Sequence, residues 1–322
     1  MEKQAECTFR LSIVVPVYRS APILPRLVEQ IFAEMCLSGL AESFELLLVN
    51  DASPDNSWQV IRTLTKTYPF IKGISLRRNF GQHNATMAGL NHARGNIIIL
   101  MDDDLQHPPQ AIGNMVRAIN DGYDVCYTQY LNRQHATWKK LGSRLNDWVA
   151  THLLNKPRGL YLSSFKAIRK EIVDEIIKYD GPYAYIDGLI LDTTRSITTI
   201  DIEHQARNEG KGNYSLRRSL SLWLKMATSF SIVPLRLATL IGFTLAVLSA
   251  VMVIFVIMQK ILHPEITAGW TSLMATVLFI GGMQMLFIGM IGEYIGRAYL
   301  KLNHKPQFVI GSSTWTGTNQ NE

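Results

Sequence analysis

Two long stretches without a charged side chain constrain the fold of this 322-residue chain more than any other feature of its sequence. Residues 237–258 and 266–291 contain no Asp, Glu, Lys or Arg over 22 and 26 positions. A helix of 22 residues is about 33 Å long, and the hydrocarbon core of a bilayer is about 30 Å thick. Core helices of soluble proteins seldom run this long without a charge. The sequence therefore predicts two transmembrane helices within residues 235–300.

Basic residues on both sides of this predicted hairpin indicate its orientation. Before it lie Arg217, Arg218, Lys225 and Arg236, and after it lie Arg297, Lys301 and Lys305. The connector 259–265 holds only Lys260 as a firm positive charge. Because basic residues concentrate on the cytoplasmic side of membrane proteins, both termini are expected in the cytoplasm. The charged N-terminus precedes only the short apolar run "LSIVVPV", so no export signal is expected.

Two further segments flank the hairpin. Residues 208–234 are amphipathic, with Leu216, Leu220, Trp223, Leu224 and Ala227 on one helical face. This stripe predicts a helix lying in the membrane interface, and a helix packed on a soluble domain gives the same stripe. Residues 301–322 form a cytoplasmic tail, and we expect its polar end "GSSTWTGTNQNE" to be loose.

Charge and cysteine content exclude several classes of protein. The formal net charge is +6, but Lys and Arg do not cluster together with aromatic residues in the sequence, so no nucleic acid is expected as a partner. Basic residues near the apolar runs favour anionic membrane lipid instead. Cys7, Cys36 and Cys126 lie far apart without a CxxC pair, which indicates neither a disulfide framework nor a zinc site.

Residues 1–207 alternate between apolar runs and amphipathic segments, which predicts an α/β domain with a mostly parallel sheet. The expected strands are "LSIVVPV", "FELLLVN", "KGISL", "NIIILMD" and "DVCYTQ". The expected helices cover residues 23–37, 57–67, 84–94 and 110–121. In such sheets the ligand site lies beyond the carboxyl ends of the strands. No GxGxxG or GxxxxGK[ST] motif follows a strand, so neither of those nucleotide-binding fingerprints is present.

Three consecutive aspartates follow the fourth predicted strand. In an extended segment Asp102 and Asp104 share a face, and Asp103 points away. Two carboxylates on one face suit Mg²⁺ or Mn²⁺, which accept hard oxygen ligands together with substrate phosphates. A solvated turn, or a cap for the helix after Pro108, would use the same residues, so the triplet alone leaves both interpretations open.

Several motifs in a fixed order resemble a known family. They read "SIVVPVYRS", "LLLVNDASPDNS", "LRRNFGQHNATMAGLNHARGN", "MDDDLQHPPQAI", "DGYDV", "ARNEGKGNYS", "VPLRLATLIG" and "IGEYIGRAY", over roughly residues 10–310. The chain resembles the inverting, family 2 glycosyltransferases with the GT-A (Rossmann-like) fold. Within them it resembles the polyprenyl-phosphate glycosyltransferases, which include dolichyl-phosphate mannose synthase and the bacterial undecaprenyl-phosphate sugar transferases.

The resemblance implies a substrate pair, a metal and a location. The donor would be a nucleotide sugar, UDP-linked in our prediction, and the acceptor would be a polyprenyl phosphate such as undecaprenyl phosphate. The cofactor would be Mg²⁺ or Mn²⁺. The protein would lie in the bacterial inner membrane, with its catalytic domain in the cytoplasm, and would supply lipid-linked sugar for cell-envelope glycans. The group also allows a homo-oligomer, and the sequence leaves the oligomeric state open.

The resemblance also implies roles for individual residues. Those expected to bind the nucleotide are Pro16, Val17, Tyr18, Asp51, Arg77, Asn79, Asp102, Asp103 and Gln106. Asp102 and Asp104 would form the DxD pair at the metal, with Asp104 as a catalytic residue. Arg207 would be catalytic and would contact the lipid phosphate together with Lys211. His83 is expected at a helix start rather than as a base.

Two departures from the family pattern concern the acceptor side of the site. Leu160 or Ser163 stands where relatives carry an aspartate, and Asn213 stands where they often carry a lysine. Since a phosphate acceptor is already an anion, we expect transfer without a carboxylate base, even with Asp187 or Asp192 neutralised. The alternatives are a processive polysaccharide synthase, whose QxxRW motif is absent here, and a catalytically inactive membrane scaffold.

Overall fold

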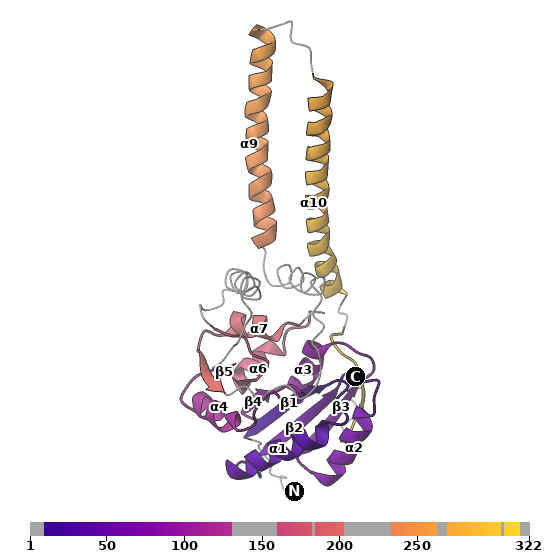
Figure 1. Cartoon of the computed structure of the whole chain (residues 1–322), viewed down its shortest axis with the longest axis vertical. Helices are drawn as coiled ribbons and strands as arrows, with labels where there is room; N and C mark the ends of the chain where they lie inside the picture. Colours follow the sequence, from indigo (N-terminus) through magenta and orange to yellow (C-terminus); the bar gives the residue numbers. More distant parts are fainter. Residues whose placement is uncertain are drawn as a thin grey trace, which may run out of the picture. The chain divides into compact units, whose positions relative to one another are not determined.

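The computed structural model describes residues 10–130, 160–181, 184–202, 233–262, 269–303 and 306–315. The chain divides into two compact units. The first comprises residues 1–213 together with 304–322, and the second comprises residues 214–303. Figure 1 shows the described elements with the labels used below.

The first unit alternates strands and helices along the chain. Its elements are β1 (Leu11–Val17), α1 (Leu24–Leu37), β2 (Phe44–Asn50), α2 (Ser57–Thr67), β3 (Ile71–Leu76), α3 (Gln82–Leu90), β4 (Ile97–Leu100), α4 (Ala111–Asn120), β5 (Val125–Tyr130), β6 (Lys166–Arg169), α6 (Lys170–Ile176), α7 (Ile186–Thr193), β7 (Ile197–Ile202) and β8 (Ile310–Ser313). The predicted α/β class is confirmed, and each expected strand and helix up to residue 130 is present with shifts of a few residues at its ends.

The described strands form one mixed, mostly parallel sheet in the order β7-β5-β6-β4-β1-β2-β3-β8. β1 lies between β2 and β4 and is parallel to both, with Val17 opposite Asn50 and Val14 opposite Leu100. The carboxyl ends of these three strands therefore meet at one edge. β6 is antiparallel to β4 and β5, and β8 is antiparallel to β3.

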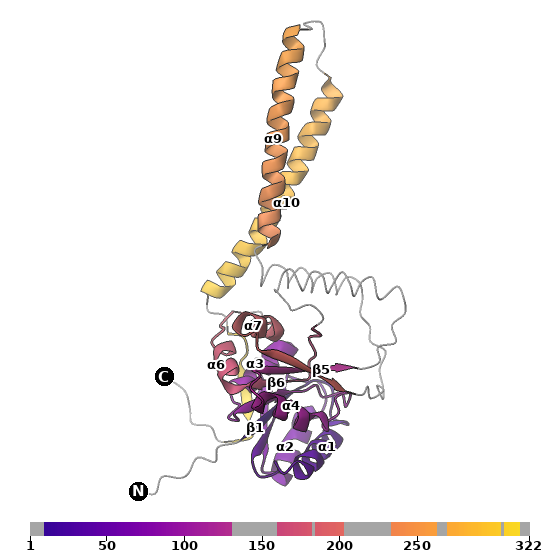
Figure 2. The ribbon, with the colours of Figure 1, turned by 90° about the vertical axis from the view of Figure 1, so that its left-hand side faces the viewer.

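Helices cover both faces of this sheet, as Figures 1 and 2 show. On one face, α1, α2 and α4 share a hydrophobic core with the alternate residues of β1 that include Ile13 and Val15. Helix α1 begins with a proline in its first turn and ends before Gly39, whose positive φ suits a helix terminus. On the other face α3 packs so closely that a Cβ at Gly89 would lie 2.3 Å from the Val14 side chain. Each buried strand thus contributes apolar side chains to two layers.

The C-terminal segment differs from the expected loose tail. Ile310–Ser313 forms β8 and completes one edge of the sheet by pairing with β3. Thr314 continues the contact, because its backbone N–H donates to Gly73 O (3.0 Å) and its hydroxyl accepts from Gly73 N–H (2.8 Å). The chain therefore returns to the first unit after the hairpin.

The second unit contains α9 (Val233–Leu262) and α10 (Trp270–Leu302), of 30 and 33 residues. Large apolar side chains on both helices are exposed, among them Phe243, Phe255, Phe279 and Ile288. Such surfaces suit lipid rather than water, so the hairpin favours association with a membrane. Among the described residues, Phe279–Gly296 is long and apolar enough to cross a bilayer by length and composition. The predicted interfacial helix within 208–234 lies outside the described residues, except for its last two positions.

Gly95 offers a test of the packing beneath the sheet. A Cβ at this position would lie 2.5 Å from the backbone nitrogen of Ser12 and 2.6 Å from the carbonyl carbon of Leu11. Since a strand backbone in the middle of the sheet cannot easily move, Gly95→Ala should destabilise the first unit by about 1–3 kcal/mol. Thermal unfolding of the full chain in detergent would measure the effect.

Gly113→Ala, within helix α4, is the matched control. A Cβ at Gly113 would meet only the Ser38 hydroxyl, at 3.6 Å. This variant should be neutral or slightly more stable, since alanine favours a helix by about 0.5–1 kcal/mol over glycine. Equal melting temperatures for the two variants would contradict the packing described here.

Candidate active site

Asp51 organises the loop that follows β3. It is buried at the end of β2 and accepts hydrogen bonds from the backbone N–H groups of Phe80 (2.7 Å) and Gly81 (2.9 Å). Burial raises the pKa of Asp51, and the two hydrogen bonds oppose that shift. Gly81 has a φ of 89°, which favours glycine. Arg77 and Asn79 lie exposed in the same loop, of which Phe80 and Gly81 are held at the end of β2.

The three aspartates lie in the loop after β4, which ends at Leu100, and point to different partners. Asp103 accepts hydrogen bonds from the Ser20 hydroxyl and from the backbone N–H of Tyr18 (3.1 Å). Burial raises the pKa of Asp103 to about 6, although these hydrogen bonds lower it. Asp103 therefore ties the loop after β4 to the loop after β1.

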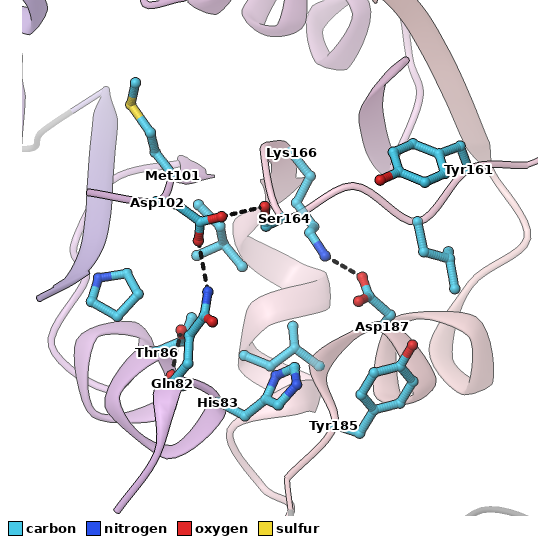
Figure 3. Close-up of a pocket in the computed structure, with 14 residues that line it drawn as sticks. Gln82, His83, Thr86, Met101, Asp102, Tyr161, Ser164, Lys166, Tyr185 and Asp187 are labelled. Carbon is cyan, nitrogen blue, oxygen red and sulfur yellow. Dashed lines mark hydrogen bonds and ion pairs between the residues drawn. The ribbon is translucent and has the colours of Figure 1, made fainter. Parts of the chain in front are cut away.

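Asp102 points away from that contact, toward a cavity (Figure 3). Its two oxygens accept hydrogen bonds from the Gln82 side chain (2.6 Å) and the Ser164 hydroxyl (2.6 Å). Asp104 accepts one from the backbone N–H of Gln106 (3.1 Å). Asp102 and Asp103 thus point in different directions, as predicted for an extended segment. The segment is a loop and not a strand, however, and the hydrogen-bond donors around each carboxylate set its direction.

His107 fixes the backbone at Asp102. The backbone N–H of Asp102 donates to Nδ1 of His107 (3.1 Å), so the neutral ring carries its hydrogen on Nε2. That nitrogen lies 3.4 Å from the Ser164 hydroxyl, and the ring stacks on Phe165 with 4.9 Å between centroids. Burial lowers the pKa of His107, which maintains the neutral form. His107 and Ser164 together hold the Asp102 carboxylate in one orientation.

The cavity beside Asp102 has a volume of about 290 Å³ and extends to α7. Its wall contains a buried ion pair between Lys166 and Asp187, and the Tyr127 hydroxyl donates to the same Asp187 oxygen (2.9 Å). Burial raises the pKa of Tyr127 well above its usual value and lowers the pKa of His83. His83, near the start of α3, contacts the Tyr185 ring edge-on, with 5.4 Å between centroids.

Some predicted residues are brought together at this edge, and others are not described. Pro16 lines the cavity, Val17 ends β1, and Tyr18 is 43% exposed. Leu160 and Ser163 are buried, and Ser163 accepts a hydrogen bond from Thr128 (3.0 Å). Arg207, Lys211 and Asn213 lie outside the described residues.

Sequence reasoning missed several residues of the cavity. They are Gln82, Ser164, Lys166 and Tyr185, which line it, and Tyr127, which donates a hydrogen bond to Asp187. Ser164 stands next to the position that we compared with the family aspartate, which was the one signal available for it. Nothing in the sequence indicates that Lys166 and Asp187, 21 positions apart, form a buried pair.

Comparisons with known proteins identify the family of the chain. Residues 12–177 match the profile of glycosyl transferase family 2, and residues 233–298 match the GtrB C-terminal hairpin. The undecaprenyl-phosphate 4-deoxy-4-formamido-L-arabinose transferases of Yersinia pestis (strain Pestoides F) and Yersinia pseudotuberculosis serotype O:3 (strain YPIII) are each 35% identical over 305 residues. These alignments cover 94% of this chain and 92% of the relatives.

Among solved structures, mannosyltransferase PcManGT from Pyrobaculum calidifontis in complex with GDP-Man and Mn²⁺ is 16% identical, with a TM-score of 0.49. The match covers 90% of this chain and 84% of that chain. Glucosyl-3-phosphoglycerate synthase from Mycobacterium tuberculosis is also 16% identical, with a TM-score of 0.48 over 70% of this chain and 80% of that chain. The family profile covers more than half of the chain and the predicted membership is confirmed: the protein belongs to glycosyl transferase family 2, with a GT-A fold and a GtrB C-terminal hairpin.

Proposed function

We propose that this protein transfers a sugar from a nucleotide-sugar donor, UDP-linked in our prediction, to undecaprenyl phosphate for modification of the cell envelope. The observation that carries this proposal is the 35% identity over 94% of the chain to undecaprenyl-phosphate sugar transferases. The aspartates that follow β2 and β4, of which Asp102 lines a cavity, supply a site of the kind that this reaction needs. A processive polysaccharide synthase lacks this support, because no QxxRW motif is present.

The reaction is a substitution at the anomeric carbon of the donor sugar. An oxygen of the lipid monophosphate attacks this carbon while its bond to the diphosphate breaks on the opposite face, which inverts the configuration. The nucleoside diphosphate leaves with the electrons of that bond. Because a phosphate monoester has a second pKa of about 6, the acceptor is largely a dianion at neutral pH and requires no base. The buried Leu160 and Ser163 are compatible with this chemistry.

Asp102 and Asp104 are the residues that would hold Mg²⁺ or Mn²⁺. Among the described residues, no group of three or more His, Cys, Asp or Glu side chains could hold a metal ion. Two carboxylates completed by diphosphate oxygens and water are the ligand set that Mg²⁺ commonly takes with nucleotides, so the residues fit. When bound, the ion would neutralise the charge that develops on the leaving diphosphate.

Asp104→Ala should therefore abolish transfer, since the remaining carboxylate of the pair cannot hold a hard cation alone. Membranes carrying the variant would be incubated with undecaprenyl phosphate and a panel of nucleotide sugars, and the lipid product detected by mass spectrometry. We expect a loss of about 100-fold or more, together with loss of Mn²⁺-dependent nucleotide binding. Asp121→Ala, at an exposed turn after α4, is the control. Full activity of Asp104→Ala, or of the wild type in metal-free buffer, would reject the metal site, and an inactive wild type would favour a scaffold.

Asp187 tests whether a carboxylate acts as the base. Lys166 and Tyr127 both donate to one oxygen of Asp187, so the carboxylate acts as an acceptor that shapes the cavity wall. Asp187→Asn should lower the melting temperature, because it leaves Lys166 buried without its counter-ion, but should leave measurable transfer. Asp192→Asn, on the exposed side of the same helix, should change neither property. An Asp187→Asn protein that folds and binds donor and lipid but transfers nothing would reveal a general base.

Chain connectivity supports the proposed membrane topology. Because Ile310–Ser313 pairs with β3, the chain must return to the side of the membrane from which it departed, which supports an even number of crossings. Phe279–Gly296 would be one crossing, and α9 is the candidate for the second. A reporter fused after Glu322 should be cytoplasmic, and a cysteine introduced at His263 should react only with reagents outside. Labelling of that cysteine from the cytoplasm alone would reject the hairpin.

A further inference from the structure

Residues 306–315, which we call the return strap, contact two loops that flank the candidate active site. On the nucleotide side, Val309 O accepts a hydrogen bond from the backbone N–H of Arg77 (2.9 Å). Arg77 begins the loop whose residues Phe80 and Gly81 donate to Asp51. The return strap therefore holds the start of this loop, and Asp51 at the end of β2 holds its other end.

On the cavity side, the contact is made by one side chain. The Gln307 amide nitrogen donates to the carbonyl oxygens of Tyr179 (2.5 Å) and Gly181 (2.9 Å). Residues 179–181 precede α7, and Tyr185 and Asp187 at its start line the cavity. Both N–H groups of a single primary amide therefore fix the backbone of residues 179–181, shortly before the cavity wall in the chain.

The return strap can serve as an anchor because its other end is fixed along the sheet. β8 pairs with β3, and Thr314 exchanges two hydrogen bonds with Gly73. The space at Gly73 is filled, since a Cβ there would lie 2.8 Å from the Thr314 methyl group. The Trp315 ring lies 5.8 Å from the His92 ring, between centroids. A shift of the return strap would therefore disturb several contacts at once.

We propose that the return strap sets the separation of the nucleotide side and the cavity side of the active site, and that Gln307 is a positioning residue for sugar transfer. Gln307 acts through the backbone of residues 179–181 on Tyr185 and Asp187. The proposal rests on the proposed function. Since α10 ends at Leu302, only three residues separate the hairpin from the return strap, so the membrane-associated helices are tied by a short link to both loops.

The test replaces the donor groups of Gln307 in the full chain in lipid nanodiscs. Gln307→Glu keeps the size of the side chain but sets a carboxylate against two carbonyl oxygens, whereas Gln307→Lys restores N–H donors. Gln59→Glu, exposed on α2, is the control for the added charge. We expect Gln307→Glu to reduce kcat for transfer to undecaprenyl phosphate at least about tenfold, because small misplacements far from the chemistry can have such effects. Gln307→Lys should recover most of that loss, and KM for the nucleotide sugar should change less than kcat.

Hydrogen exchange supplies a readout that does not depend on turnover. Gln307→Glu should accelerate exchange in residues 179–187 while residues 57–67 remain as protected as in the wild type. Unchanged exchange in residues 179–187, or kcat equal to that of Gln59→Glu, would overturn the proposal. Equal losses of kcat and melting temperature in the Glu and Lys variants would also overturn it, because they would indicate a purely structural role. A wild type that transfers no sugar would overturn the proposed function alone, because the exchange comparison would still report the positioning.

Discussion

The parallel register of β1 with β2 and β4 brings three strand ends to one edge of the sheet, and the candidate site is built from the segments that leave this edge. The backbone groups in those segments need hydrogen-bond partners, and aspartate side chains supply them. Asp51 holds the loop after β3, and Asp103 holds the loop after β1. The raised pKa values of both residues reflect the burial that this role imposes.

The same constraint explains how three adjacent carboxylates coexist. Each is directed to its own donors, so the like charges diverge instead of facing one another. Asp103 accepts a hydrogen bond from Ser20, and Asp104 accepts one from the backbone N–H of Gln106. Asp102 accepts hydrogen bonds from Gln82 and Ser164. Of the three, Asp102 lines the cavity. The cavity wall also contains compensated charges, because Lys166 and Asp187 form a buried ion pair.

Periodicity in the sequence was sufficient for the central layers of the fold and insufficient at its edges. Strands such as Phe44–Asn50 are buried at every position, and α1 repeats apolar residues with a helical period, so both are visible in the sequence. β8 has only one apolar residue among "IGSS" and is held mainly by its backbone, which leaves no pattern to read. The sequence likewise indicated only some residues of the candidate site. The aspartates follow strands and could be placed, whereas the contacts of Ser164 with Asp102 and of Lys166 with Asp187 join segments 62 and 21 positions apart through tertiary packing.

The position of β8 also has a consequence for biosynthesis. The ribosome completes β3 more than 230 residues before it reaches Ile310, and α9 and α10 are made in between. During that interval one edge of the sheet has unpaired backbone groups, which is a recognised risk for aggregation. The edge can close only after both hairpin helices have emerged and the chain has turned back. The sheet can therefore be completed only after the hairpin has been synthesised in full, and a chain truncated within the hairpin would retain an open edge available to chaperones and proteases.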